Sequence, residues 1–164
     1  MKKQLLIYLL TAALLLIGGF DTSWGYAAER EWYYHFTFHF AHASVWHLAG
    51  NLLCFYILTR YRASWVELIA AYLVASLCSF ISPHTLPTVG LSGLIYALLG
   101  LRLAMSKRLS QQSVIRMLLI ILLPCLTGKV NVLLHLSSLG AGYLLYRTYN
   151  NLMQISRYAK RYYR

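Results

Sequence analysis

Six long apolar runs divide this chain, and they limit what it can fold into more than any other feature. The runs cover residues 4–20, 40–59, 64–81, 91–105, 113–126 and 130–146, with short polar connections between them. Runs of this kind are typical of helices that cross a bilayer, where every backbone polar group must be bonded within its own segment. The sequence therefore predicts an all-α polytopic membrane protein, a six-transmembrane-helix bundle that forms a single domain over residues 1–164.

The composition agrees with a place in the lipid bilayer. Hydrophobic residues make up 59% of the chain and charged residues 12%, which is outside the usual range of soluble domains. The net charge of +11 raises the question of nucleic-acid binding. The Lys and Arg residues fall between the apolar runs rather than on one basic face, however, so no nucleic-acid partner is expected.

Cys54, Cys78 and Cys125 lie inside apolar runs without metal or redox spacing and are expected to be buried free thiols.

The positions of the basic residues predict the topology. With the N-terminus inside, 13 of the 15 Lys and Arg residues lie on the inner side, and only Arg30 and Lys129 lie outside. This bias predicts that both termini are cytoplasmic. Residues 148–164 are then a basic cytoplasmic tail at the inner leaflet. Residues 21–37 are an external loop, rich in the aromatic side chains that favour the headgroup level.

The first apolar run has two interpretations. Lys2 and Lys3 ahead of residues 4–20 resemble the start of a secretory signal peptide. The run is long for such a peptide, and residues 21–28 offer only a weak cleavage site. An uncleaved first span is favoured.

Polar residues interrupt the second, fourth and sixth runs at similar depth. Lys107 follows Ser92 by 15 positions, so at ~1.5 Å per residue Ser92 lies about 22 Å from the inner charges, within a hydrocarbon core of about 30 Å. Similar counts to the inner charges place His47 and His135 near this level. Because polar side chains inside a membrane are costly, these residues are functional candidates.

Helical spacing predicts which of these residues share a face. His47 and Asn51 are four residues apart, as are Ser92 and Tyr96. His135, Ser138 and Gly142 also share a face, whereas His42 lies on another and is expected to be structural. Small residues at Ser138 and Gly142 would face Gly93 and Ala97, and the close approach would bring His135 within reach of Ser92.

These residue types are suited to nucleophilic catalysis. A serine hydroxyl becomes a nucleophile when a neighbouring base such as histidine takes its proton, which suggests Ser92 and His135. A helix N-terminus, with His47 and Asn51, supplies donors for an oxyanion. None of the four acidic residues, Asp21, Glu29, Glu31 and Glu67, is at the depth of His135. We therefore predict a dyad, with Tyr96 packing on the imidazole.

A metal or other cofactor is not expected. The motif His-Glu-x-x-His is absent, and His42 with His47 lacks a placed third ligand. A transporter would require intramembrane charge or an internal repeat, and the sequence has neither.

Three motifs carry a resemblance to a known family. They are Thr37-x-x-Phe40-x-His42-x-x-x-x-His47-x-x-x-Asn51, then Gly90-Leu91-Ser92-Gly93 followed by Tyr96 and Gly100, then His135-x-x-Ser138-x-x-x-Gly142. Their order and placement, over residues 32–146, resemble the rhomboid family of intramembrane serine proteases. The resemblance implies Ser92 as nucleophile and His135 as general base. It also implies that His47, Asn51 and the Ser92 backbone N–H are oxyanion donors.

The same resemblance implies the wider setting. The fold would be the six-helix minimal bacterial form, in the inner membrane, with the first external loop embedded in the bilayer and a transmembrane protein as substrate. Two departures stand out: Tyr33-Tyr34 lies where the family has Trp-Arg, and Ser138 replaces a glycine. A non-catalytic member of the same fold that binds transmembrane helices remains the alternative.

Overall fold

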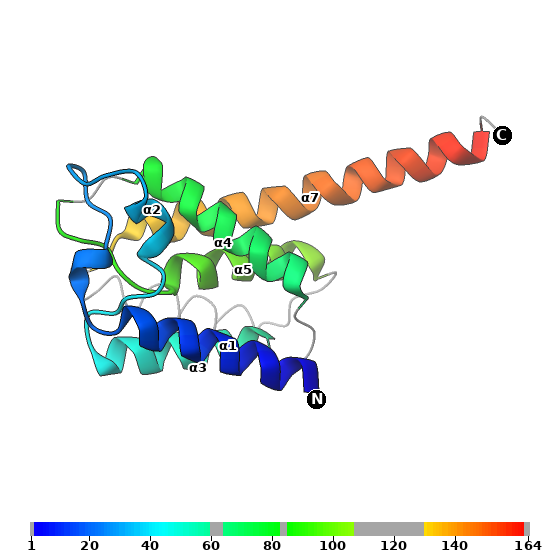
Figure 1. Cartoon of the computed structure of the whole chain (residues 1–164). Helices are drawn as coiled ribbons and strands as arrows, with labels where there is room; N and C mark the ends of the chain where they lie inside the picture. The colour runs from blue at the N-terminus through cyan, green and yellow to red at the C-terminus, as the bar shows by residue number, and fades with distance from the viewer. Residues whose placement is uncertain (1, 60–63, 83–84, 107–129, 163–164) are drawn as a thin grey trace.

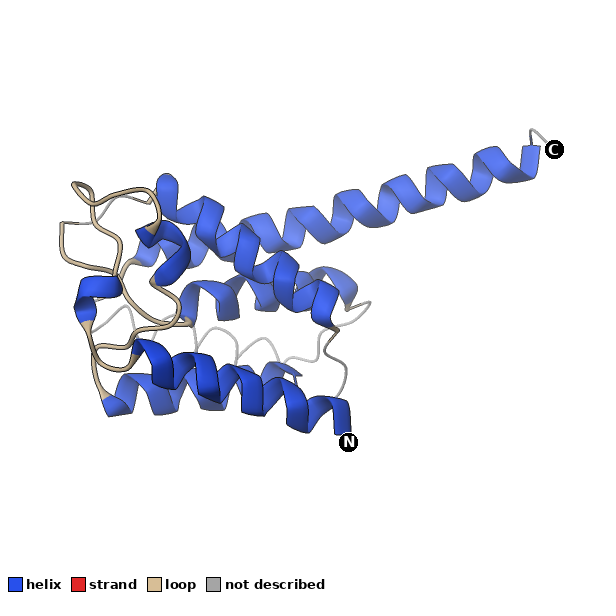
Figure 2. Cartoon of the chain, in the orientation of Figure 1, coloured by secondary structure: helices blue, strands red, loops and turns tan. Residues whose placement is uncertain are grey.

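The computed structural model describes residues 2–59, 64–82, 85–106 and 130–162. The elements in these ranges are α1 (Lys2–Gly18), the 3-10 helix η1 (Thr22–Trp24), α2 (Tyr34–Thr37), α3 (Val45–Thr59), α4 (Trp65–Phe80), α5 (Ser92–Met105) and α7 (Val132–Tyr162). The all-α class is thus confirmed for the described part of the chain, as Figure 2 shows. The predicted run 113–126, with Cys125, lies outside the described residues.

Side-chain caps decide where several helices begin. Ser44 accepts a hydrogen bond from the His47 backbone N–H at 3.2 Å, so α3 begins at Val45. The second apolar run is expected at about residues 40–59, and the helix within it covers Val45–Thr59, so His42 lies in the loop ahead of α3. At α4, Ser64 and Glu67 form a reciprocal capping box.

The last helix is longer than its apolar run. Asn131 caps its start by accepting from the Leu134 N–H at 3.0 Å. The helix continues from Val132 to Tyr162, past the expected end at residue 146, because no Gly or Pro interrupts residues 143–162. Its C-terminal half extends beyond the other helices in Figure 1. The basic tail is thus helical through residue 162.

Helix α5 lies at the centre and contacts α3, α4 and α7. Every residue from Gly93 to Leu101 is buried. A Cβ on Gly142 would overlap the backbone carbonyl of Ala97, so α5 and α7 approach as closely as small residues permit. A Cβ on Gly93 would first meet the side chains of Ala75 and Leu134, each at 3.4 Å.

The outer surface of the bundle is rich in apolar side chains. Leu16 is 75% exposed, Val66 77% and Trp46 83%. Soluble proteins rarely expose large contiguous apolar patches, so this surface is typical of contact with lipid. None of the helices in the described ranges combines the length and the apolar character needed to cross a membrane. Cys78 is buried and Cys54 half-buried, and both are free thiols.

The loops and the chain ends lie at opposite ends of the bundle. The loops before α3 and α5 gather at one end, whereas the N-terminus and the projecting end of α7 lie at the other (Figure 1). At the loop end the Thr88 N–H donates to the Tyr26 carbonyl and the Gly90 N–H donates to the Phe38 carbonyl, each at 2.8 Å. These bonds join the segment ahead of α5 to the first loop.

Candidate active site

The turn ahead of α5 depends on Gly90. Its φ of 115° lies in a region that residues with a side chain rarely adopt. A Cβ at this position would lie 2.6 Å from Cε1 of His47 and 3.1 Å from Nδ2 of Asn51. Only glycine therefore lets the backbone pass this close to α3 just before the helix that starts with Ser92.

Ser92 and His135 are in direct contact across the interface between α5 and α7. Ser92 Oγ lies 2.8 Å from His135 Nε2. The Tyr96 ring stacks on the imidazole with centroids 4.2 Å apart and planes 9° from parallel. Since Tyr96 is one helical turn after Ser92, α5 provides both the hydroxyl and the surface that holds the imidazole plane.

No carboxylate bonds to this histidine. His135 Nδ1 is buried and has no hydrogen-bond partner among the described residues, which include all four acids. Glu67 pairs with Arg102 at 2.9 Å, where Arg102 is in the last turn of α5. Asp21 caps η1 through Ser23, and Glu29 and Glu31 are exposed.

His47 and Asn51 lie on the face of α3 that meets Gly90. Asn51 is buried, and its Nδ2 donor has no partner in the described part of the chain. His42 has a different setting: its Nε2 accepts the Leu91 N–H at 3.4 Å, and its ring stands edge-on to His47 with centroids 5.2 Å apart. His42 thus supports the turn ahead of Ser92 from the loop.

Ser138 lies one turn after His135 on α7 and is fully buried. Its hydroxyl has no hydrogen-bond partner in the described ranges.

Across those same ranges, no three His, Cys, Asp or Glu side chains gather closely enough to hold a metal ion.

Arg30 anchors the first loop, a role that the sequence interpretation missed. One guanidinium nitrogen donates to the carbonyls of Thr22, Ser23 and Gly25 at 3.3, 2.6 and 2.9 Å. The guanidinium also lies over the Tyr34 ring, 5.4 Å from its centroid. The predicted topology marks Arg30 as one of two basic residues on the outside, but it does not indicate the carbonyls to which Arg30 bonds.

Asn131 joins three distant segments and was also missed. Its Nδ2 donates to the Tyr26 hydroxyl at 2.8 Å and to the Ser82 carbonyl at 3.1 Å, while its Oδ1 caps α7. Because it comes one turn before His135, this network sets where the helix that carries the histidine begins. A lone asparagine at the start of an apolar run has no helical periodicity that would reveal this role.

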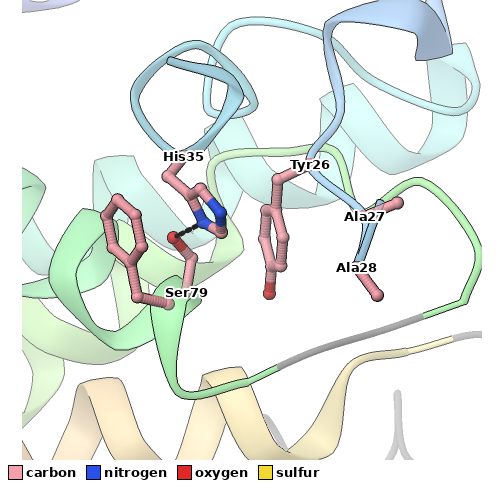
Figure 3. A pocket seen from close by; sticks show the side chains of 6 residues that line it. Tyr26, Ala27, Ala28, His35 and Ser79 are labelled. Carbon is pink, nitrogen blue, oxygen red and sulfur yellow. Dashed lines mark hydrogen bonds between the residues drawn. The ribbon is translucent and has the colours of Figure 1, made fainter. Parts of the chain in front are cut away.

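A second group of histidines fastens the first loop to α4. His35 Nδ1 is 2.7 Å from Ser79 Oγ and His39 Nε2 is 3.0 Å from Ser76 Oγ. The His35 ring stacks on Phe80 on one side and on Tyr26 on the other, and Figure 3 shows it beside a small pocket. Burial lowers the pKa of His35. The contacts hold the loop rather than present a reactive group.

These features define a helical protein with an apolar outer surface and a hydrogen-bonded serine–histidine pair at the start of its central helix. The model of the Rhomboid domain family matches residues 29–151, which is most of the chain. The protein therefore belongs to the rhomboid family, whose members are membrane proteins and in general intramembrane serine proteases. Neither the curated proteins nor the solved structures include a significant match to the chain.

Proposed function

We propose that this protein is an intramembrane serine endopeptidase that cleaves transmembrane segments with a Ser92–His135 dyad. The observation that carries the proposal is the 2.8 Å contact between Ser92 Oγ and His135 Nε2. A hydroxyl in this contact can pass its proton to the imidazole as it attacks a carbonyl carbon. Membership of the rhomboid family supports the same reaction.

The reaction proceeds in two halves. His135 Nε2 takes the proton of Ser92 as Oγ attacks the scissile carbonyl, and the imidazolium then protonates the departing amine. An acyl ester on Ser92 remains, which water hydrolyses with His135 again acting as base. The stacked Tyr96 ring keeps the imidazole plane oriented between these steps. No metal or other cofactor is required for this sequence.

The oxyanion donors come from two elements. The first N–H groups of a helix have no intrahelical acceptor, so the N–H of Ser92 is a donor at the reacting centre. The preceding Leu91 N–H already bonds to His42. His47 and Asn51, which face Gly90, provide the side-chain donors. Each such donor contributes about 10²–10³ in kcat.

The substrate and setting follow from the proposed chemistry. A helix must unwind to expose a scissile carbonyl, so a transmembrane segment with small or helix-breaking residues near the external face is the expected substrate. We further propose six spans, cytoplasmic termini and a place in a bacterial inner membrane. The inside bias of the basic residues supports this topology.

The test uses the purified full-length chain in detergent. Wild type should react with a fluorophosphonate probe at Ser92 and cleave a model transmembrane peptide that has glycine and alanine near one end. Ser92→Ala and His135→Ala should abolish both signals. Ser137→Ala is the matched control, since its hydroxyl bonds to the Leu134 carbonyl, away from the dyad.

Two outcomes contradict the proposal. Cleavage by Ser92→Ala at the wild-type rate would show that another group acts. A wild type that binds the peptide without labelling or cleavage would instead indicate the alternative, a non-catalytic member that binds transmembrane helices.

A further inference from the structure

The histidine in the first turn of α3 takes part in the cap that starts this helix. The Ser44 carbonyl accepts the first helical hydrogen bond, from the Leu48 N–H at 3.0 Å. The Ser44 hydroxyl accepts from the His47 N–H at 3.2 Å. In return, the Ala43 N–H donates to Nδ1 of His47 at 3.4 Å. The backbone of the cap and the side chain of His47 therefore hold each other in place.

A similar arrangement with an acidic residue starts α4. Ser64 Oγ accepts from the Glu67 N–H at 3.2 Å, and a Glu67 carboxylate oxygen accepts from the Ser64 N–H at 3.1 Å. Glutamate and glutamine are the usual residues at this position of a capping box. In α3 the same position carries His47, which accepts from the residue before the cap. A cap requires only an acceptor here, so the imidazole needs a second explanation.

The bond from Ala43 determines the tautomer of His47. A backbone N–H can only donate, so Nδ1 must be the unprotonated nitrogen of the neutral ring. The hydrogen bond made by one ring nitrogen sets which of the two carries the proton. The proton of neutral His47 is therefore on Nε2, and this nitrogen is a donor.

This donor lies beside the turn that leads into Ser92. A Cβ on Gly90 would lie 2.9 Å from Nε2 of His47 and 3.1 Å from Nδ2 of Asn51, so both nitrogens border the same point of the backbone. Donors that face a developing oxyanion stabilise it. The opposite tautomer of His47 would present a lone pair in this place and repel the negative charge.

The other polar side chains near His47 are engaged differently. His42 accepts the Leu91 N–H through Nε2, and its ring stands edge-on to His47 with centroids 5.2 Å apart. Nδ2 of Asn51 has no hydrogen-bond partner in the described ranges. These contacts leave the orientation of the His47 ring to the cap of α3.

We propose that Ser44 is a positioning residue for His47. Its hydroxyl holds the start of α3 so that the Ala43 N–H meets Nδ1, which keeps the ring in the tautomer that carries its proton on Nε2. The inference rests on the proposed function, in which His47 is an oxyanion donor. The cap that begins α3 and the device that prepares this donor are then one structure.

The kinetic test separates this role from helix stability. Ser44→Ala removes the capping hydroxyl, and kcat for the model peptide should fall about tenfold with KM unchanged, a factor that matches the loss of one cap. Ser44→Thr keeps a capping hydroxyl and should stay within about threefold of wild type. Ser64→Ala is the matched control, because it removes the equivalent cap from α4, which carries none of the proposed site residues. It should lower Tm to a similar extent while kcat stays within about twofold of wild type.

A spectroscopic measurement tests the tautomer without turnover. In ¹⁵N-histidine-labelled protein in alkaline buffer, the nitrogen shifts distinguish protonated from unprotonated ring nitrogens. The His47 signals, assigned by their absence from His47→Gln, should show the proton on Nε2 in wild type. In Ser44→Ala the tautomer with the proton on Nδ1 should appear beside it.

The inference is wrong if Ser44→Ala keeps kcat within about twofold of wild type, or if Ser64→Ala loses as much activity as Ser44→Ala. It is also wrong if His47 of the wild type carries its proton on Nδ1, or if its tautomers are the same in wild type and Ser44→Ala. An inactive wild type would refute the proposed function instead, and the ring signals would then decide the link between cap and tautomer by themselves.

Discussion

Gly90→Ala should lower the rate of cleavage strongly while the protein remains folded. The added Cβ would lie 2.6 Å from His47 Cε1 and 2.9 Å from His47 Nε2, whereas carbon contacts are ordinarily about 3.5–4.0 Å. The imidazole must therefore move by about 1 Å. A displacement of this size at a reacting centre can lower the rate by about 10².

The backbone adds a separate cost to the same substitution. A φ of 115° is rarely adopted by alanine, and holding a residue in such a region costs about 1–3 kcal/mol. The ring of His47 can turn aside, so we expect a fall of several degrees in Tm rather than unfolding. The expected pattern is about a hundredfold loss of kcat in protein that remains folded.

The assay compares Gly90→Ala with a matched glycine on the same helix as His47. A Cβ at Gly50 meets nothing within 4 Å, so Gly50→Ala should preserve activity and slightly stabilise α3. Labelling rate, cleavage rate and Tm are measured for both variants in detergent. If Gly90→Ala stays within threefold of Gly50→Ala in rate, the close approach of the turn to His47 has no catalytic importance.

Three further predictions concern the dyad and the two missed anchors. Replacing all four acids by their amides (Asp21→Asn, Glu29→Gln, Glu31→Gln and Glu67→Gln) should leave fluorophosphonate labelling of folded protein within about tenfold of wild type, because no carboxylate contacts His135. A loss near the 10⁴ seen for a triad aspartate would reveal a hidden third member. Asn131→Ala should lower Tm, and Asn131→Asp should lower Tm less. The aspartate can still accept the Leu134 N–H that caps α7, and such a cap is worth about 0.5–2 kcal/mol. Equal Tm values for both variants and wild type would contradict the anchoring role. Arg30→Met keeps an unbranched side chain but loses the three carbonyl bonds and the guanidinium over Tyr34. Amide hydrogen exchange at residues 22–25 should therefore speed up while exchange in α5 is unchanged. Unaltered exchange at residues 22–25 would mean that the loop is held by other contacts.

The sequence alone predicted the helices and the depth of the candidate residues. Both depend on distance along one chain: apolar runs mark helices, and counting residues to the basic ends places Ser92, His47 and His135 near one level. The all-α class is confirmed in the described residues, and membership of the family is confirmed by the domain match. The catalytic roles stay predictions.

Tertiary packing decided which of the candidate residues contact one another. Helical spacing predicts which residues share a face, but the direction of that face depends on neighbours from distant segments. Gly142 meets the backbone of Ala97, whereas the side chains nearest to Gly93 are those of Ala75 and Leu134. His42 lies outside α3 because Ser44 caps the helix, which therefore begins at Val45, after the start of the apolar run.

The anchors of the loop end were also decided by the fold alone. Arg30 bonds to backbone carbonyls, which carry no side-chain signature in a sequence. Asn131 bonds to Tyr26, 105 residues away along the chain. Hydrogen bonds between segments so far apart depend on how helices tilt and rotate as their side chains pack, and a one-dimensional pattern does not contain those angles.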